Sequence, residues 1–151
     1  MIAGGHDKRW SSMIVPFETG DTLMTVELSL LVWSAVLTVM LAVIGATGAM
    51  LQVGLPMLAG NRENVPEITG WAGRAVRAHR NMLENLILFA ILVLVAKAIG
   101  VSNSMTVLGA QFFVGGRVTH AVLYISGVAW LRTAAFAVSL VGLAMILLQL
   151  R

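Results

Sequence analysis

The chain has 151 residues, of which 58% are hydrophobic and only 11% are charged. A soluble domain typically carries about 25% charged residues, so the composition excludes an ordinary soluble protein and indicates one small integral membrane domain. The lack of cysteine excludes disulfides and any metal or thiol chemistry that uses the chain's own sulfur. The formal net charge is +3, but the basic residues form no exposed run, so we expect no nucleic-acid partner.

The N-terminal stretch differs in character from the rest of the chain. Residues 1–23 are polar and lack the apolar segment of about 7–15 residues that defines a signal peptide. We interpret them as a disordered extension or a misplaced translation start, with a short interfacial segment anchored by Trp10 as the alternative. Residues 24–151 then form a single membrane domain.

Four apolar stretches, separated by short turns with glycine or proline, predict four membrane-spanning helices. Roughly 20 helical residues cross the hydrocarbon core of a bilayer. The expected helices lie at about residues 26–58, 70–98, 104–126 and 132–150. Ser102, Asn103 or Ser104 can cap the third helix. Glycines that allow close packing recur along it, at Gly109, Gly115 and Gly116. The predicted fold is an all-α membrane protein, a four-transmembrane-helix bundle.

Charged residues near the helix ends predict the orientation. Glu27 lies at the start of the first helix. The first and third loops lie on the same side of the membrane and carry Arg62 and Arg132. Loops on the cytoplasmic side of a membrane are enriched in arginine and lysine. We therefore expect a multi-pass protein of the inner or plasma membrane, with this side in the cytoplasm and both termini outside.

The second expected helix is unusually polar for a membrane span. Arg77, Arg80, Asn81 and Glu84 recur at i, i+3, i+4 and i+7, which places them on one narrow face at about 100° per residue, with Arg74 beside them. A second polar face follows on the third helix at i, i+3 and i+7, formed by Arg117, His120 and Tyr124. Charges within membrane helices are costly and normally face a bundle interior or a wet cavity, so both faces mark a candidate site.

The chemistry of these two faces indicates an anion as the ligand. Four arginines stand against one glutamate, and burying unpaired charge is expensive. Arginine offers a planar fork for carboxylate or phosphate, while Asn81, His120 and Tyr124 add hydrogen bonds and groups able to transfer protons. The set fits a small zwitterion with several carboxylates.

Structural readings of the same residues stay open. Arg77, Arg80 and Glu84 can form an ion-pair network, and Arg117 can pair with Glu84 as a lock between helices. His120 can simply make a hydrogen bond between helices. The histidines and Glu84 lie at unrelated spacings, so we expect no metal site.

Three motifs carry a family resemblance: Arg77-Ala-His-Arg-Asn81-x-x-Glu84-Asn85 on the second helix, Arg117-x-x-His120-x-x-x-Tyr124 on the third, and Leu131-Arg132 opening the fourth. Together they resemble the MAPEG family, the membrane-associated proteins of eicosanoid and glutathione metabolism, in its bacterial form. The resemblance spans about residues 24–151 and implies a homotrimer of four-helix bundles that binds bent glutathione between subunits. It implies glutathione contacts from the matching residues, which are Arg77, Arg80, Asn81, Glu84, Arg117, His120 and Tyr124.

Two departures from the family pattern concern activation of the glutathione thiol. In the transferases and synthases of the family, an arginine early in the fourth helix activates the thiol, and its place here holds Phe136. A further arginine near the end of the first helix is absent, with Gly54 close to its place. A thiol with a pKa of ~8.5 needs a nearby cation or donor to react as the thiolate. Arg132 or Arg117 would substitute, and the resemblance suggests Arg132 and Tyr124 as catalytic residues.

We weigh three functions. The first is a glutathione-dependent transferase or peroxidase that acts on lipophilic electrophiles arriving from the bilayer between the first and fourth helices. The second is a protein of the same fold that binds another anion or a lipid headgroup without glutathione chemistry, which the departures at Phe136 and Gly54 favour. The third, a proton-coupled exporter, needs an acid deep in the first helix, whereas Glu27 lies at its mouth.

Overall fold

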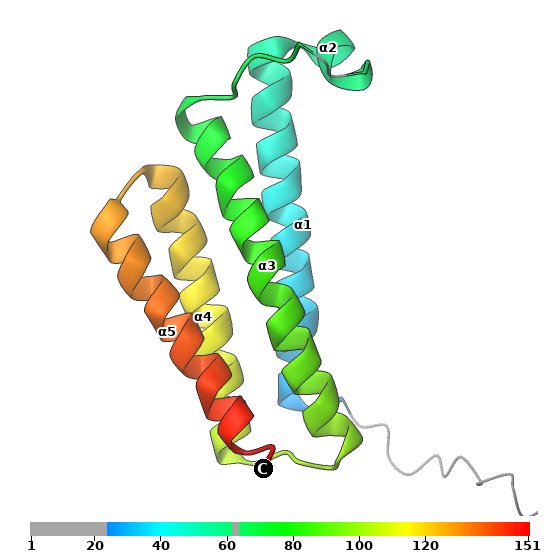
Figure 1. Ribbon diagram of the computed structural model, residues 1–151, viewed down its shortest axis with the longest axis vertical. Coiled ribbons are helices and arrows are strands. Elements are labelled where there is room, and N and C mark those ends of the chain that lie inside the picture. The colour runs from blue at the N-terminus through cyan, green and yellow to red at the C-terminus, as the bar shows by residue number, and fades with distance from the viewer. Residues whose placement is uncertain (1–23, 62–63) are drawn as a thin grey trace, which may run out of the picture.

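The computed structural model describes residues 24–61 and 64–151, and every regular element within these ranges is a helix. They are α1 (Val26–Val53), α2 (Leu55–Ala59), α3 (Gly70–Ala98), α4 (Ser104–Ser126) and α5 (Ala129–Leu148). The four long helices run antiparallel to their neighbours in sequence, and the short α2 lies at the upper end of the bundle in Figure 1. The expectations for residues 1–23 and for Arg62 concern positions outside the described residues.

The protein is a helical membrane protein. Helices α1, α3 and α5 are each long and apolar enough to cross a bilayer, and many large apolar side chains on their surfaces are exposed. Helix α4 has 23 residues but does not reach the same apolar character. A fourth span and the orientation of the chain in the membrane therefore stay predictions.

Glycine sets two helix ends at positions that differ from the predicted ones. α1 ends at Val53 rather than near residue 58, because Gly54 adopts a φ of +82° and a separate short helix with Pro56 in its first turn begins at Leu55. α5 begins at Ala129 rather than near residue 132, because Gly127 ends α4 in the left-handed conformation at φ +89° and only Gly127 and Val128 link the two helices. The ranges of α3 and α4 coincide with those predicted.

Asn103 is the residue that caps α4. Its Oδ1 accepts hydrogen bonds from the backbone N–H groups of Met105 at 2.9 Å and Thr106 at 3.0 Å. The hydroxyl oxygen of Thr106 in turn accepts from the backbone N–H of Asn103 at 2.9 Å. This reciprocal arrangement satisfies donors that a helix start leaves unpaired, and it fixes where the α3–α4 turn ends.

The long helices form two pairs, α1 with α3 and α4 with α5, which lie side by side in Figure 1. Glycines let α4 and α5 approach closely: a Cβ on Gly116 would lie 2.9 Å from the carbonyl oxygen of Ala135, and one on Gly109 would lie 2.8 Å from that of Gly142. The same expectation for Gly115 is wrong, since that position faces open space.

Aromatic stacking joins the two pairs at mid-height. Phe89 of α3 lies on Phe113 of α4 with ring centroids 4.1 Å apart, and both side chains are fully buried. Arg117 follows Phe113 by one helical turn on the same face of α4. Burial of Phe113 in the apolar core therefore orients the guanidinium of Arg117 toward the space between the two helix pairs.

Candidate functional site

A cluster of polar side chains lies between the helix pairs toward the end of the bundle where α3 begins and α4 ends. We call it the arginine cluster, and it contains Asn81, Arg117, His120, Tyr124 and Arg132. Asn81 comes from α3, Arg132 from α5, and the others from one face of α4. The i, i+3, i+7 spacing on α4 brings its three members together as the sequence predicts.

Arg117 is the centre of the cluster and is only 1% exposed. Its Nη2 donates to Oδ1 of Asn81 at 2.8 Å, and its Nε contacts the sulfur of Met82 at 3.4 Å. Its Nη1 is buried and has no hydrogen-bond partner within the described residues. A buried donor without an acceptor typically costs about 1–3 kcal/mol, and more when it is charged. Arg117 Nη1 therefore retains a hydrogen-bonding capacity that the described residues do not use.

The partner of Arg117 differs from the expected one. Arg117 contacts Asn81, whereas Glu84 lies within 3.4 Å of Nε of Arg80 on its own helix. The lock between Arg117 and Glu84 is therefore not formed. Asn81 and Glu84 are three residues apart, and only Asn81 is turned far enough toward α4 to meet the guanidinium.

His120 is 4% exposed and packs between aromatic rings. Its ring meets the edge of Tyr124 at a centroid distance of 5.4 Å and lies 6.1 Å from the ring of Phe136. No hydrogen bond among the described residues uses the imidazole, so the reading of His120 as an interhelix hydrogen bond does not hold there. Its two ring nitrogens remain available to a ligand.

Arg132 places a second guanidinium at the cluster from the first turn of α5. Its Cζ lies 4.2 Å from the ring centroid of Tyr124, which is a close cation–π contact. Phe136 follows one turn later on the same face and lies 6.0 Å from the Cζ of Arg117. Phe136 therefore fills a position within the cluster without supplying a charge, while Arg132 supplies one.

The remaining predicted site residues lie on the outside of a single copy of the chain. Arg77, Arg80 and Glu84 are exposed, and the side chains of the 3.4 Å pair Arg80–Glu84 are 83% and 60% exposed. The predicted stripe on α3 is thus divided, with Asn81 turned inward and the others turned outward. Since exposed charges are costly at membrane depth, this face fits contact with another subunit or with headgroups.

Arg74 has a structural contact that the sequence did not reveal. Its Nε donates to the carbonyl oxygen of Ile125 at 2.7 Å, and its side chain packs against the turn at Gly127. A cation at the end of a helix pairs well with carbonyls that have no intrahelical partner. Arg74 therefore stabilises the end of α4 that carries Tyr124.

Sequence reasoning also missed a buried charge at the opposite end of the bundle. Glu27 is 4% exposed and accepts hydrogen bonds from the hydroxyls of Ser102 and Thr106, which are 75 and 79 residues away in sequence. The one available signal was an acidic residue at the start of an apolar helix. Periodicity cannot predict contacts over such separations, since they depend on how the helices pack.

Comparison with known proteins gives one family. The model of the MAPEG family matches residues 26–151, which is more than four-fifths of the chain and includes every residue of the arginine cluster. No curated protein matches this chain.

Proposed function

This chain belongs to the MAPEG family, and we propose that it is a membrane-embedded, glutathione-dependent transferase or peroxidase that acts on lipophilic electrophiles. The observation that carries the proposal is the buried Arg117, whose Nη1 lies near Asn81, His120 and Tyr124 and has no acceptor among the residues that the structure describes. Such a site gains most from a ligand that brings a carboxylate or another anionic oxygen.

Glutathione suits the chemistry of these residues. The tripeptide carries two carboxylates, one ammonium and a thiol. A carboxylate accepts from Arg117 Nη1, and Asn81 and His120 offer further hydrogen bonds to peptide groups. Glu84 suits the ammonium, and Arg77 and Arg80 suit the second carboxylate.

The outward position of Arg77, Arg80 and Glu84 supports a site shared between subunits. One copy of the chain directs these side chains away from its own Arg117. In the proposed homotrimer, the outward face of α3 from one subunit and the arginine cluster of the next would enclose one glutathione. Exclusion of lipid and water from the interface would strengthen each of these charge contacts.

Arg132 is the residue we propose to activate the thiol. A guanidinium near the sulfur stabilises the thiolate, which then attacks an electrophilic carbon and displaces its leaving group, or attacks a peroxide oxygen and breaks the O–O bond with release of the alkoxide; a second glutathione would then reduce the resulting sulfenate to the disulfide. The contact of Arg132 with Tyr124 at 4.2 Å holds both side chains on the same side of the cluster. The Tyr124 hydroxyl can then donate a hydrogen bond to the sulfur. Phe136 would border the path of the lipophilic substrate.

A second function is favoured by one observation. Phe136 brings an apolar ring to the cluster where the family's transferases carry the activating arginine, so the site can retain an anion without activating a thiol. In that case the protein binds another anion or a lipid headgroup in a structural or binding role.

Titration of the detergent-purified protein with glutathione separates the two functions. Binding is followed by calorimetry and thiolate formation by ultraviolet absorbance, with S-methylglutathione as a ligand that cannot form a thiolate. For the glutathione-dependent enzyme, we expect saturable binding of both ligands and a thiolate signal with glutathione but not with S-methylglutathione. Binding without that signal favours the second function, and lack of binding at millimolar concentration contradicts a glutathione site.

Arg132→Leu tests the activating residue, with Arg151→Leu at the exposed C-terminus as the control for lost positive charge. We expect Arg132→Leu to reduce the thiolate signal and to lower kcat/KM by about 10- to 100-fold, since a positioned cation at the reacting atom is lost. Affinity for S-methylglutathione should change little. Equal thiolate formation in both variants would remove Arg132 from this role.

A further inference from the structure

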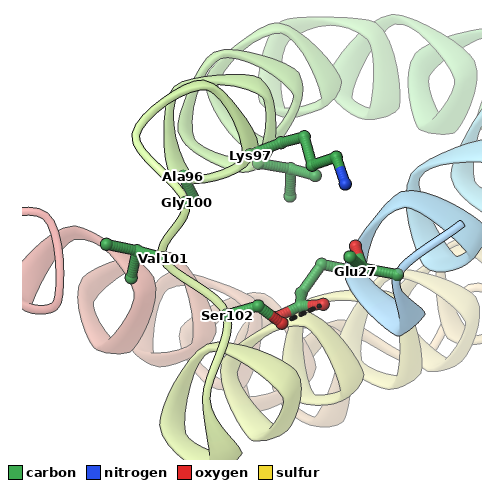
Figure 2. A pocket seen from close by; sticks show the side chains of 8 residues that line it. Glu27, Ala96, Lys97, Gly100, Val101 and Ser102 are labelled. Atoms are coloured by element: carbon green, nitrogen blue, oxygen red, sulfur yellow. Dashed lines mark hydrogen bonds between the residues drawn. The ribbon is translucent and has the colours of Figure 1, made fainter. Parts of the chain in front are cut away.

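The polar groups at the end of the bundle opposite the arginine cluster satisfy one another. Figure 2 shows a pocket there, with the hydrogen bond that the hydroxyl of Ser102 donates to the carboxylate of Glu27. The same carboxylate accepts from the hydroxyl of Thr106, so α1, α4 and the turn that precedes α4 are joined at this point. This pocket therefore has a structural role, and polar side chains without such contacts lie elsewhere.

The outer face of α4 carries two polar side chains, Gln111 and Thr119. Both are exposed, and neither side chain forms a hydrogen bond with another described residue. The arginine cluster does not account for them, because Arg117 and His120 of the same helix are turned inward and buried. Gln111 and Thr119 line one groove with Val138, at the middle of α5, a helix long and apolar enough to cross a bilayer. Lipid chains form no hydrogen bonds, so an amide and a hydroxyl at this depth favour a polar partner.

The groove between α4 and α5 has a volume of about 210 Å³, and two adjacent glycines shape it. Gly116 lets α5 approach, since a Cβ there would lie 2.9 Å from the carbonyl oxygen of Ala135. A Cβ on Gly115 would meet nothing within 4 Å, so the space beside it stays open. Phe112, which is 40% exposed, adds an aromatic ring to the lining. The groove is therefore a local hollow that suits a flat ring.

The spacing of the two polar groups limits the chemistry of the ligand. Gln111 and Thr119 are eight residues apart, which is about 12 Å along a helix. Carbonyl oxygens on opposite sides of a six-membered ring are about 5 Å apart, and a hydrogen bond adds about 2.9 Å at each oxygen. Such a ring therefore spans about 11 Å between two donors. The amide of Gln111 and the hydroxyl of Thr119 can both donate, so a ring with two opposed carbonyls matches them.

The size of the groove limits the ring system. Sites for drug-sized ligands typically measure about 300–1,000 Å³, which is more than this groove provides. It fits a head of one or two rings. Because Gln111, Phe112 and Gly115 are all exposed, the groove opens at the surface of the helix pair, and an apolar tail on the ring can extend into the bilayer.

We propose that the α4–α5 groove binds the ring of a lipophilic quinone, with one carbonyl oxygen accepting from Gln111 and the other from Thr119. The ring would lie over Gly115 and against Phe112. Binding would satisfy both polar side chains at membrane depth without any change in the helix pair. The site is independent of the arginine cluster and of its proposed function.

The test uses the detergent-purified full chain and equilibrium dialysis with menadione and with methylnaphthalene, which has the same rings without carbonyls. Both values are corrected for partition into protein-free micelles. We expect menadione to bind about tenfold or more tightly, since two hydrogen bonds distinguish the compounds. Equal binding would mean that the groove accepts any apolar group, such as a lipid chain, and no binding of either compound would leave the face to a helix of another subunit. Either result overturns the proposal.

Gln111→Leu and Thr119→Val remove the two polar groups one at a time. Each should reduce the preference for menadione about threefold or more, while binding of methylnaphthalene and of glutathione is unchanged. Thr133→Val is the matched control, because that exposed hydroxyl donates to the carbonyl of Ala129 and lies outside the groove. Gly115→Leu should fill the groove and abolish binding of both compounds. A full preference retained in both polar variants, or unchanged binding in Gly115→Leu, contradicts the site.

Discussion

The two ends of this bundle each bury one charged side chain, and they satisfy it to different degrees. Glu27 receives hydrogen bonds from two hydroxyls, and one of them comes from the first turn of α4. Arg117 donates to one amide oxygen and makes a weak contact with a sulfur, and its Nη1 has no hydrogen-bond partner in the described part of the chain. A charge that the fold satisfies mainly holds elements together, whereas a charge left short of partners favours a ligand. The comparison therefore predicts different results from removing each charge.

The largest effect is expected from Arg117→Met, which replaces the guanidinium by a flexible apolar side chain of similar length. Glutathione affinity should fall by about 100-fold, since a buried charged contact is worth about 1.5–3 kcal/mol. The melting temperature of the ligand-free protein should stay within a few degrees, because the unsatisfied N–H is removed together with the contact to Asn81. A large loss of stability with intact binding would make Arg117 a structural residue instead.

Glu27→Ala should give the opposite pattern. The hydroxyls of Ser102 and Thr106 lose their acceptor, so the free energy of unfolding should fall by about 1–3 kcal/mol while glutathione affinity is unchanged. The measurement is thermal or chemical denaturation in detergent. Glu67→Ala, at an exposed position between α2 and α3, is the control and should stay within about 0.5 kcal/mol of the parent. Similar stability of the two variants would contradict a structural role for Glu27.

Sequence patterns were sufficient for the ranges of α3 and α4 and for the polar face of α4, but not for the single polar face predicted on α3 or for the partners of these residues. Arg117, His120 and Tyr124 share a face because their spacing alone fixes it. The choice of Asn81 over Glu84 depends on how α3 is rotated against α4, which is set by packing such as the stack of Phe89 on Phe113.

The helix ends show the same limit. Asn103 was one of three candidate caps, and all three have suitable side chains, so only the backbone geometry selects it. Gly115 and Gly116 are adjacent and chemically identical, yet Gly116 faces α5 and Gly115 faces open space. The sequence could not distinguish them before the crossing of α4 and α5 was known.

These two glycines give the third prediction. A Cβ on Gly116 would lie 2.6 Å from Oγ of Ser139 and 2.9 Å from the carbonyl oxygen of Ala135, so Gly116→Ala should destabilise by about 1–3 kcal/mol. Gly115→Ala meets nothing within 4 Å and should stabilise the helix by up to about 1 kcal/mol. Paired thermal denaturation measures both, and a similar loss for both would mean that Gly115 packs against another subunit.

The smallest change in the free energy of unfolding of a single chain is expected from Glu84→Gln. This variant tests the exposed charged residues of α3 near the arginine cluster. The pair Arg80–Glu84 is an exposed i, i+4 contact, and such pairs contribute about 0.3–0.5 kcal/mol. Assembly should respond much more strongly if the outward face of α3 meets another subunit, because Arg80 would then be buried without its partner.

Light scattering after size-exclusion chromatography reports the number of subunits. We expect a reduced assembled fraction that the double variant Arg80→Gln, Glu84→Gln partly restores, since it removes both charges together. An unchanged assembly in both variants would place this face against lipid headgroups, and the glutathione site would then have to be completed within one chain by the residues around Arg117.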